Sequence, residues 1–197
     1  PMVGVQGIMT TDTYPKGFSA TVGDATITWI AKGSGMIEPN MATMLVYIFT
    51  DASFDAVTLD RMLRAAVELS FNMLSVDSDT STSDTCAILA NGLAGTVDEL
   101  AFVEALIAGC EKMTEILARD GEGANRMIRA NVRGALNNYE AKRVAKSLVN
   151  SPLVKTMVAG ADPNVGGLLM AVGKCFECTI RPANTDAWIN GHPVVVG

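Results

Sequence analysis

The residues best suited to covalent chemistry are Ala42 and Thr43, which follow a glycine-rich segment and precede an apolar run. The hydroxyl of Thr43 could attack the carbonyl carbon of Ala42. Hydrolysis of the ester formed in this way would leave Thr43 as a new N-terminus. Its freed α-amine, with an ordinary pKa of about 8, could then act as the base for its own hydroxyl. The pair therefore has the chemistry of a self-cleaving N-terminal nucleophile.

Spacing alone does not favour this chemistry, because a threonine that begins a strand is usually only a β-former. Nucleotide binding by the segment Gly33-Ser34-Gly35 is weaker still. No Gly-Lys-Ser/Thr follows it and no helix is predicted directly after it, as a phosphate-binding loop would require.

The elements around this segment alternate between strands and helices. Val, Ile, Tyr and Phe in 43–50 predict a buried strand, and apolar spacing over 59–70 predicts a helix with Thr58 as N-cap. Asn190-Gly191 predicts a type I′ hairpin. Further strands are expected at 25–30, 86–90, 125–134, 187–189 and 194–196, and further helices at 98–117, 140–150 and 168–172. This interleaving indicates an α/β (α+β) fold.

The composition indicates a chain with a large core and an acidic surface. Of 197 residues, 49% are hydrophobic and 18% are charged, and the net charge is -6. An acidic surface repels phosphate backbones and anionic lipids, so we expect no nucleic acid and no membrane as partner. The longest apolar run, 41–49, is too short to span a bilayer.

The start of the chain and its cysteines bear on its cellular compartment. The first residues, Pro1-Met2-Val3-Gly4, contain no basic region, so we expect no signal peptide. Because the chain does not begin with methionine, we expect a cut or renumbered start with sequence upstream of it. Four cysteines without a secretion signal predict free thiols in a reducing, cytoplasmic compartment.

Five ordered motifs give the chain a resemblance to a known family. They are Ile8–Lys16, Ser70–Asn72 with Val76–Thr85, Asp120–Ala124, Asn150–Thr156 and Ala161–Gly166. Together with the segment from Lys32 to Leu45, they resemble the ornithine acetyltransferases, also called glutamate N-acetyltransferases or the bifunctional enzymes of arginine biosynthesis. The resemblance covers the whole chain, and several long motifs in one order are specific.

The resemblance implies a set of site residues. Thr43 matches the nucleophile, and the bond between Ala42 and Thr43 matches the cleavage point between the α and β chains. Residues 1–42 then correspond to the C-terminal part of the α chain, and residues 43–197 to most of the β chain. Thr10, Lys32, Thr43 and Glu122 match substrate-binding positions. From their charges, Lys32 could bind a substrate carboxylate and Glu122 the amine of an amino acid. Without the resemblance, both would be read as ordinary surface residues.

The resemblance also implies a fold, a reaction and partners. The fold is a layered αββα sandwich of the DmpA/ornithine acetyltransferase type, with both processed chains in one domain. The reaction moves acetyl from N-acetylornithine to glutamate through an acetyl-threonine intermediate. It needs no metal and no organic cofactor, although acetyl-CoA is a co-substrate for some members. The assembly implied is a heterotetramer of two α and two β chains.

The chain departs from the family pattern in two ways. Gly167 stands where the family usually carries an arginine, which puts a local charge contact in doubt. Family members are also about twice as long. Their upstream Thr-Gly oxyanion pair and their C-terminal Asn and Thr contacts match nothing here. Two alternatives therefore stay open: a hydrolase or aminopeptidase on the same scaffold, and a silent structural fragment.

Three further patterns are weaker candidates for chemistry. Cys175 and Cys178 form one C-x-x-C motif, for which buried thiols are favoured over a zinc site. His192 is expected in the hairpin turn, and no catalytic triad is supported. The run from Asp77 to Asp84 lacks the spacing of a calcium loop, so we expect capping and turn hydrogen bonds instead.

Overall fold

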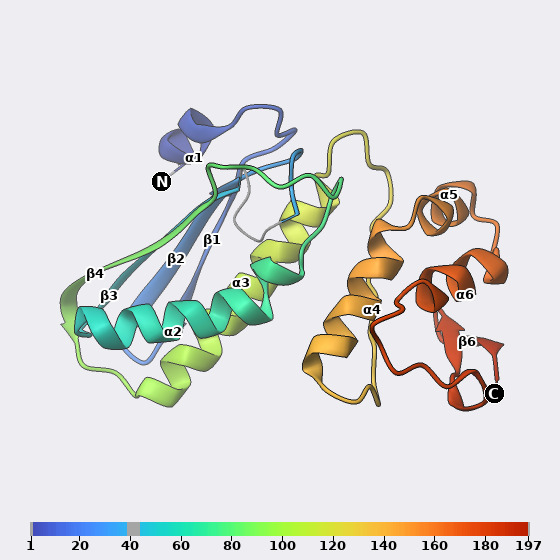
Figure 1. Cartoon of the computed structure of the whole chain (residues 1–197). Helices are drawn as coiled ribbons and strands as arrows, with labels where there is room; N and C mark the ends of the chain where they lie inside the picture. The colour runs from blue at the N-terminus through green and yellow to red at the C-terminus, as the bar shows by residue number, and fades with distance from the viewer. Residues whose placement is uncertain (1, 39–43, 197) are drawn as a thin grey trace. The chain divides into compact units, whose positions relative to one another are not determined.

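The computed structural model describes residues 2–38 and 44–196, and the chain divides into two compact units. The N-terminal unit is Pro1–Ala124 and the C-terminal unit is Asn125–Gly197. Figure 1 shows the elements of both units. The expected processing into chains 1–42 and 43–197, which together form one domain, stays a prediction. The boundary between the compact units lies elsewhere, after Ala124.

The N-terminal unit is built on a four-stranded sheet in the order β1-β2-β3-β4 (Figure 1). Strands β1 (Lys16–Val22), β2 (Ala25–Lys32) and β3 (Leu45–Ala52) are antiparallel neighbours. β3 pairs in parallel with β4 (Thr85–Gly95), and α2 (Ala56–Leu69) lies between these two strands in the chain. A helical crossover is the usual connection of parallel neighbours.

Two helices cover one face of this sheet. α2 and α3 (Glu99–Arg119) lie side by side over it, and α2 is followed by the 3-10 turn η1 (Phe71–Met73) (Figure 1). Trp29 on β2 is fully buried beneath α3, where a Cβ added at Gly109 would overlap its indole ring. The core also contains Ile27, Ala31, Val46, Ile48, Leu59, Met62, Phe102, Leu106, Cys110 and Leu117. The alternation along the strands and the helical spacing of α2 and α3 produce this core.

The short helix α1 (Met2–Ile8) contacts β1 and β2. Its Val5 is buried and lies next to the position of a Cβ at Gly17. The segment that follows α1 therefore begins at the sheet, and residues 9–15 run from there to β1.

The C-terminal unit contains three helices and a small hairpin. The helices are α4 (Asn138–Asn150), α5 (Pro152–Gly160) and α6 (Val165–Gly173). A 3-10 turn, η2 (Pro182–Asn184), precedes β5 (Ala187–Ile189) and β6 (His192–Val195). Among the described residues, the core of the C-terminal unit is formed by Val154, Met157 and Ala171.

Most predicted elements are confirmed. The strands near 25–30, 43–50 and 86–90 and the helices near 59–70, 98–117, 140–150 and 168–172 all occur, with shifted ends. The predicted hairpin is present, and both Asn190 and Gly191 have positive φ, 50° and 83°, as a type I′ turn needs.

Other predictions were wrong. Segment 125–134 is not a strand; a strand needs a hydrogen-bonded neighbour, and the strands of the C-terminal unit, β5 and β6, pair with each other. The N-cap of α2 is Asp55, not Thr58, because the Asp55 carboxylate accepts the N–H groups of Val57 and Thr58. α1, β1 and α5 were not predicted at all.

Candidate active site

Three strand ends meet at one edge of the sheet in the N-terminal unit. Lys32 at the end of β2 pairs with Leu45 at the start of β3, which pairs with Thr85 at the start of β4. The residue before β3, Met44, donates its N–H to Asp84 Oδ1 at 2.6 Å and accepts the N–H of Thr85 at 3.0 Å. This edge therefore positions Lys32 and the residues that lead into β3.

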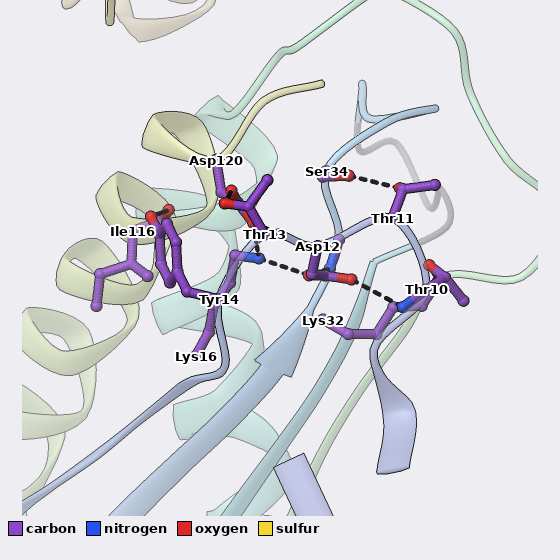
Figure 2. A network of polar contacts seen from close by, with 11 residues as sticks. Thr10, Thr11, Asp12, Thr13, Tyr14, Lys16, Lys32, Ser34, Ile116 and Asp120 are labelled. Atoms are coloured by element: carbon purple, nitrogen blue, oxygen red, sulfur yellow. Dashed lines mark hydrogen bonds and ion pairs between the residues drawn. The ribbon is translucent and has the colours of Figure 1, made fainter. Parts of the chain in front are cut away.

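Lys32 and Thr10 lie together at this edge. The Lys32 side chain is buried, with the residue 7% exposed, and its Nζ donates a long hydrogen bond of 3.4 Å to Thr10 Oγ1 (Figure 2). A buried ammonium is costly unless an anion or several acceptors surround it. Among the described residues, the Thr10 hydroxyl binds it at this long distance and the Asp84 carboxyl group interacts with its charge. A substrate carboxylate could supply a further anionic partner for Lys32.

Glu122 lies in the loop after α3, close to the glycine-rich segment. Its N–H donates to Ser34 O at 2.7 Å, and its Oε2 lies 2.4 Å from the position that a Cβ at Gly35 would take, too close for a side chain there unless Glu122 moves. Ser34 Oγ and Thr11 Oγ1 are 2.6 Å apart and share a hydrogen bond. Glycine at position 35 thus lets an exposed carboxylate approach the backbone closely.

A buried ion cluster connects the same segments (Figure 2). Lys16 Nζ lies 2.5 Å from Asp12 Oδ1 and 2.5 Å from Asp120 Oδ2. Asp120 also accepts hydrogen bonds from the N–H and the hydroxyl of Thr13. Tyr14 covers Lys16 at 5.1 Å from its ring centroid, and its hydroxyl donates to Ile116 O of α3.

The cluster shifts the protonation of both carboxyl groups. Burial by itself would raise the pKa of Asp12, but the N–H of Gly33, the Lys16 ammonium and the N–H of Thr10 outweigh it, so the pKa is lowered. The pKa of Asp120 is likewise lowered, because Lys16 and Thr13 outweigh the effect of burial. Both groups are therefore carboxylates at neutral pH.

Asp84 differs from these two carboxyl groups. Burial raises its pKa, and the N–H of Met44 and the charge of Lys32 offset this rise only in part. Its Oδ2 is buried and accepts no hydrogen bond from the described residues. Asp84 is thus a partly desolvated carboxyl group in the electrostatic field of Lys32, one residue before β4.

The structure brings three of the predicted site residues, Thr10, Lys32 and Glu122, to neighbouring segments of one unit. The predicted nucleophile Thr43 and its neighbour Ala42 lie outside the described residues. The substrate roles assigned to all five stay predictions.

The sequence reasoning missed Asp12, Lys16, Asp84 and Asp120. All four lie inside recognised motifs, with Asp12 and Lys16 in 8–16, Asp84 in 76–85 and Asp120 in 120–124, but none of them was given a role. The one local signal is the aspartate four residues before Lys16, and this spacing does not distinguish a buried ion pair from an exposed one.

The weaker candidates are accounted for by local structure. Asp77 accepts the N–H of Asp79, and Ser81 Oγ accepts the N–H of Ser83, which confirms the expected turn bonding. Asp77 also accepts the N–H groups of Met36 and Ile37, which lie in the glycine-rich segment. Asn164 caps α6 by accepting the N–H of Gly167 at 3.0 Å. A Cβ at Gly167 would come within 3.2 Å of Leu153 Cβ, so a side chain there would need Leu153 to shift.

The cysteines and His192 show no catalytic arrangement. All four thiols are free, as predicted. Burial raises the pKa values of Cys86 and Cys110 to about 12, which leaves both as neutral thiols.

His192 is the first residue of β6, paired with Ile189, and not a turn residue. The described residues contain no group of three metal-ligating side chains.

Among residues 2–38 and 44–196, no helix is both long and apolar enough to cross a lipid bilayer.

Comparison with known proteins gives consistent matches. The ArgJ family model matches residues 3–197. The arginine biosynthesis bifunctional protein ArgJ 2 of Clostridium acetobutylicum is 51% identical over 96% of this chain and 49% of its own length. The glutamate N-acetyltransferase Oat2 of Streptomyces clavuligerus is 51% identical over 88% of this chain and 44% of its own length. The chain thus spans about half the length of the curated relatives it matches.

A crystal structure of the arginine biosynthesis bifunctional protein argJ from Bacillus halodurans has a similar fold. It is 37% identical, has a TM-score of 0.72, and the match covers 79% of each chain. This similarity confirms the predicted mixed α/β fold of the layered sandwich type.

Proposed function

Because the chain belongs to the ArgJ family, we propose that it is part of an acetyltransferase that moves the acetyl group of N-acetylornithine to glutamate. The observation that carries this proposal is the grouping of Lys32, Thr10 and Glu122 at one end of the N-terminal unit. An ammonium and a carboxylate on adjacent segments suit an amino-acid substrate, whose charged groups are the opposite pair.

The proposed nucleophile is Thr43, freed by cleavage of the Ala42–Thr43 bond. In the first half-reaction, its Oγ forms a bond to the acetyl carbon while the amide C–N bond of N-acetylornithine breaks. The Thr43 α-amine takes the hydroxyl proton and returns a proton to the leaving amine. In the second half-reaction, the amine of glutamate forms a bond to the acetyl carbon while the ester bond to Thr43 Oγ breaks. The Thr43 α-amine takes a proton from the attacking amine and returns one to Oγ, which restores the hydroxyl.

Three residues of the N-terminal unit have proposed roles in binding the substrates. Lys32 binds a substrate carboxylate, Glu122 binds the amine side, and Thr10 orients Lys32 through its hydroxyl. No organic cofactor takes part, and acetyl-CoA is a further acyl donor to be tested. The proposed assembly is a heterotetramer of two α and two β chains in the cytoplasm.

The direct test uses the full-length protein with N-acetylornithine, with and without glutamate. Acetylglutamate formation, with ornithine release that depends on glutamate, supports the transferase. Ornithine release of equal rate without glutamate would instead identify a hydrolase, in which water takes the acetyl group.

Cleavage is tested with a matched pair of variants. Thr43→Ala, which lacks the attacking hydroxyl, should run as one uncut chain on a denaturing gel. Thr43→Ser keeps the hydroxyl and should retain some processing. Two fragments from Thr43→Ala would contradict self-cleavage at this bond.

A further inference from the structure

Two of the segments that carry the proposed substrate-binding residues are held by one carboxylate. Asp12 Oδ2 accepts the N–H of Thr10 at 3.1 Å, and Asp12 Oδ1 accepts the N–H of Gly33 at 2.7 Å. Gly33 directly follows Lys32. The backbone of Thr10 and the backbone beside Lys32 are therefore fixed relative to each other through Asp12.

The third segment is connected through Lys16. Its ammonium lies 2.5 Å from both Asp12 and Asp120, and Asp120 is two residues before Glu122. Asp120 and Lys16 are 104 residues apart in the chain. The cluster thus joins the end of α3 to the loop that precedes β1 (Figure 2).

Burial separates these three residues from any substrate. The side chains of Asp12 and Lys16 have no solvent exposure, and that of Asp120 is 3% exposed. They cannot serve as ligands at the surface where Thr10 and Glu122 are exposed. Buried charges must also keep their partners, because an uncompensated charge is strongly unfavourable. The cluster therefore permits one arrangement of its attached segments and penalises others.

We propose that Asp12, held by Lys16 and coupled through it to Asp120, is the positioning residue that sets the relative placement of Thr10, Lys32 and Glu122. The proposal rests on the proposed function for the substrate that these three residues bind. Its structural part, the fixing of three segments by one cluster, can be measured without any substrate.

The kinetic test is Asp12→Asn in the full-length protein. The amide keeps the size of the carboxylate, and its one oxygen cannot accept all the hydrogen bonds that Asp12 accepts. We expect the KM for N-acetylornithine to rise about tenfold or more, with a smaller change in kcat, because displaced ligands weaken binding.

Two controls separate positioning from general loss of stability. Asp55→Asn removes the charge of another carboxylate that accepts two backbone N–H groups, at the N-terminus of α2. Leu59→Ala weakens the core beneath the sheet. Both should leave KM within about twofold of the unmodified protein when measured well below the unfolding temperature. A KM in Asp12→Asn that matches these controls would overturn the proposal.

A double-mutant cycle tests whether Asp12 acts through Thr10. If it does, Asp12→Asn should raise KM less in a Thr10→Ala background than in the unmodified protein. Leu59→Ala should have the same effect in both backgrounds. Full additivity of Asp12→Asn and Thr10→Ala would contradict positioning through Thr10.

Hydrogen exchange supplies the readout that does not depend on activity. Asp12→Asn should speed exchange in peptides covering residues 10–13 and 32–35, and Asp120→Asn in peptides covering 120–122, while β4 stays protected. Unchanged exchange in all these peptides would overturn the proposal. Absence of acetyl transfer by the unmodified protein, with the expected exchange pattern, would refute the proposed function and leave the positioning cluster supported.

Discussion

The two compact units use charge in opposite ways. In the N-terminal unit, Lys16 is fully buried between two carboxylates from distant parts of the chain. In the C-terminal unit, the ion pair between Arg143 and Glu177 lies at the surface, with side chains 52% and 39% exposed. Removing one partner of the buried cluster leaves an uncompensated buried charge and strongly destabilises the fold. Removing one partner of the exposed pair changes the stability little.

The two units also differ in net charge and in the size of their cores. Residues 1–124 contain six basic and seventeen acidic side chains, and residues 125–197 contain nine basic and four acidic ones. The N-terminal unit also has the larger buried core, with Trp29 and Phe102 fully buried. Thr10, Lys32 and Glu122 all lie in the N-terminal unit, which also contains the ion cluster proposed to position them.

The largest effect should come from breaking the buried cluster. Lys16→Met leaves Asp12 and Asp120 buried without their cation, and should lower the free energy of unfolding by about 3–5 kcal/mol. The matched change in the other unit, Arg143→Met, should cost less than about 1 kcal/mol. Urea unfolding, followed by hydrogen exchange in peptides of each unit, measures both. Equal costs for the two variants would contradict the comparison.

A second test adds one methyl group to a helix of each unit. A Cβ at Gly109 in α3 would overlap the Trp29 ring, whereas one at Gly173 in α6 would meet no atom within 4 Å. Gly109→Ala should therefore destabilise the N-terminal unit by about 3 kcal/mol, despite the better helix propensity of alanine. Gly173→Ala should be neutral or slightly stabilising by the same urea assay. A neutral Gly109→Ala would show that the packing of α3 on β2 is looser than described.

Acid should destabilise the N-terminal unit through Asp12 and Asp120. The pKa values of Asp12 and Asp120 are lowered in the folded chain, so the unfolded chain binds more protons below the ordinary pKa of about 4. Their contribution to stability is present above this pH and is lost as the pH falls through the lowered folded values. Asp120→Asn should flatten this dependence in the N-terminal unit, measured by urea unfolding between neutral and acidic pH.

The exposed carboxylate Glu177 provides the control for the acid series. Its pKa is lowered by its own backbone N–H and by Arg143, but it is at the surface. Glu177→Gln should change the pH dependence of stability little. A larger effect for Glu177→Gln than for Asp120→Asn would reverse the assignment of the acid-sensitive groups.

The smallest effect is expected at Asp84. Its raised pKa means that the carboxylate is disfavoured in the folded chain, so the charge reduces stability near neutral pH. Asp84→Asn keeps an oxygen to accept the N–H of Met44 and removes this charge. Stability at neutral pH should stay the same or rise by up to about 1 kcal/mol, and the gain should shrink as the pH is lowered. A loss of stability at neutral pH would contradict the described desolvation.

The sequence predicted the elements whose signals are local. The apolar spacing of Phe102, Leu106, Cys110 and Met113 indicated α3, and Asn190-Gly191 indicated the C-terminal hairpin. Strand β1 was missed although Phe18, Ala20 and Val22 alternate with polar residues, because the segment is short and begins with Lys16 and Gly17, which are not typical of a strand. α5 was missed because Pro152 was interpreted only as the stop of α4, although proline is favoured in the first turn of the next helix.

Some residues of the candidate site could be predicted from the sequence, and others could not. Thr10, Lys32 and Glu122 were predicted from motifs that resemble a family, and the structure places them on adjacent segments. The role of Asp120 depends on its contact with Lys16 across 104 residues, which no local pattern encodes. Asp12 is four residues from Lys16, but it also binds the N–H of Gly33, 21 residues away. A single charged residue in a polar segment is expected at the surface, so burial of Lys16 could not be predicted without its two partners.

The central claim is that Thr43 carries the acetyl group between substrates, and it has a direct test. The full-length protein is incubated with N-acetylornithine without glutamate, quenched in acid, digested and analysed by mass spectrometry. The account predicts a peptide that begins at Thr43 and carries one acetyl group, which disappears when glutamate is added before the quench. An intact Ala42–Thr43 bond in active protein, or acetyl transfer with no acetylated Thr43 peptide, would contradict it.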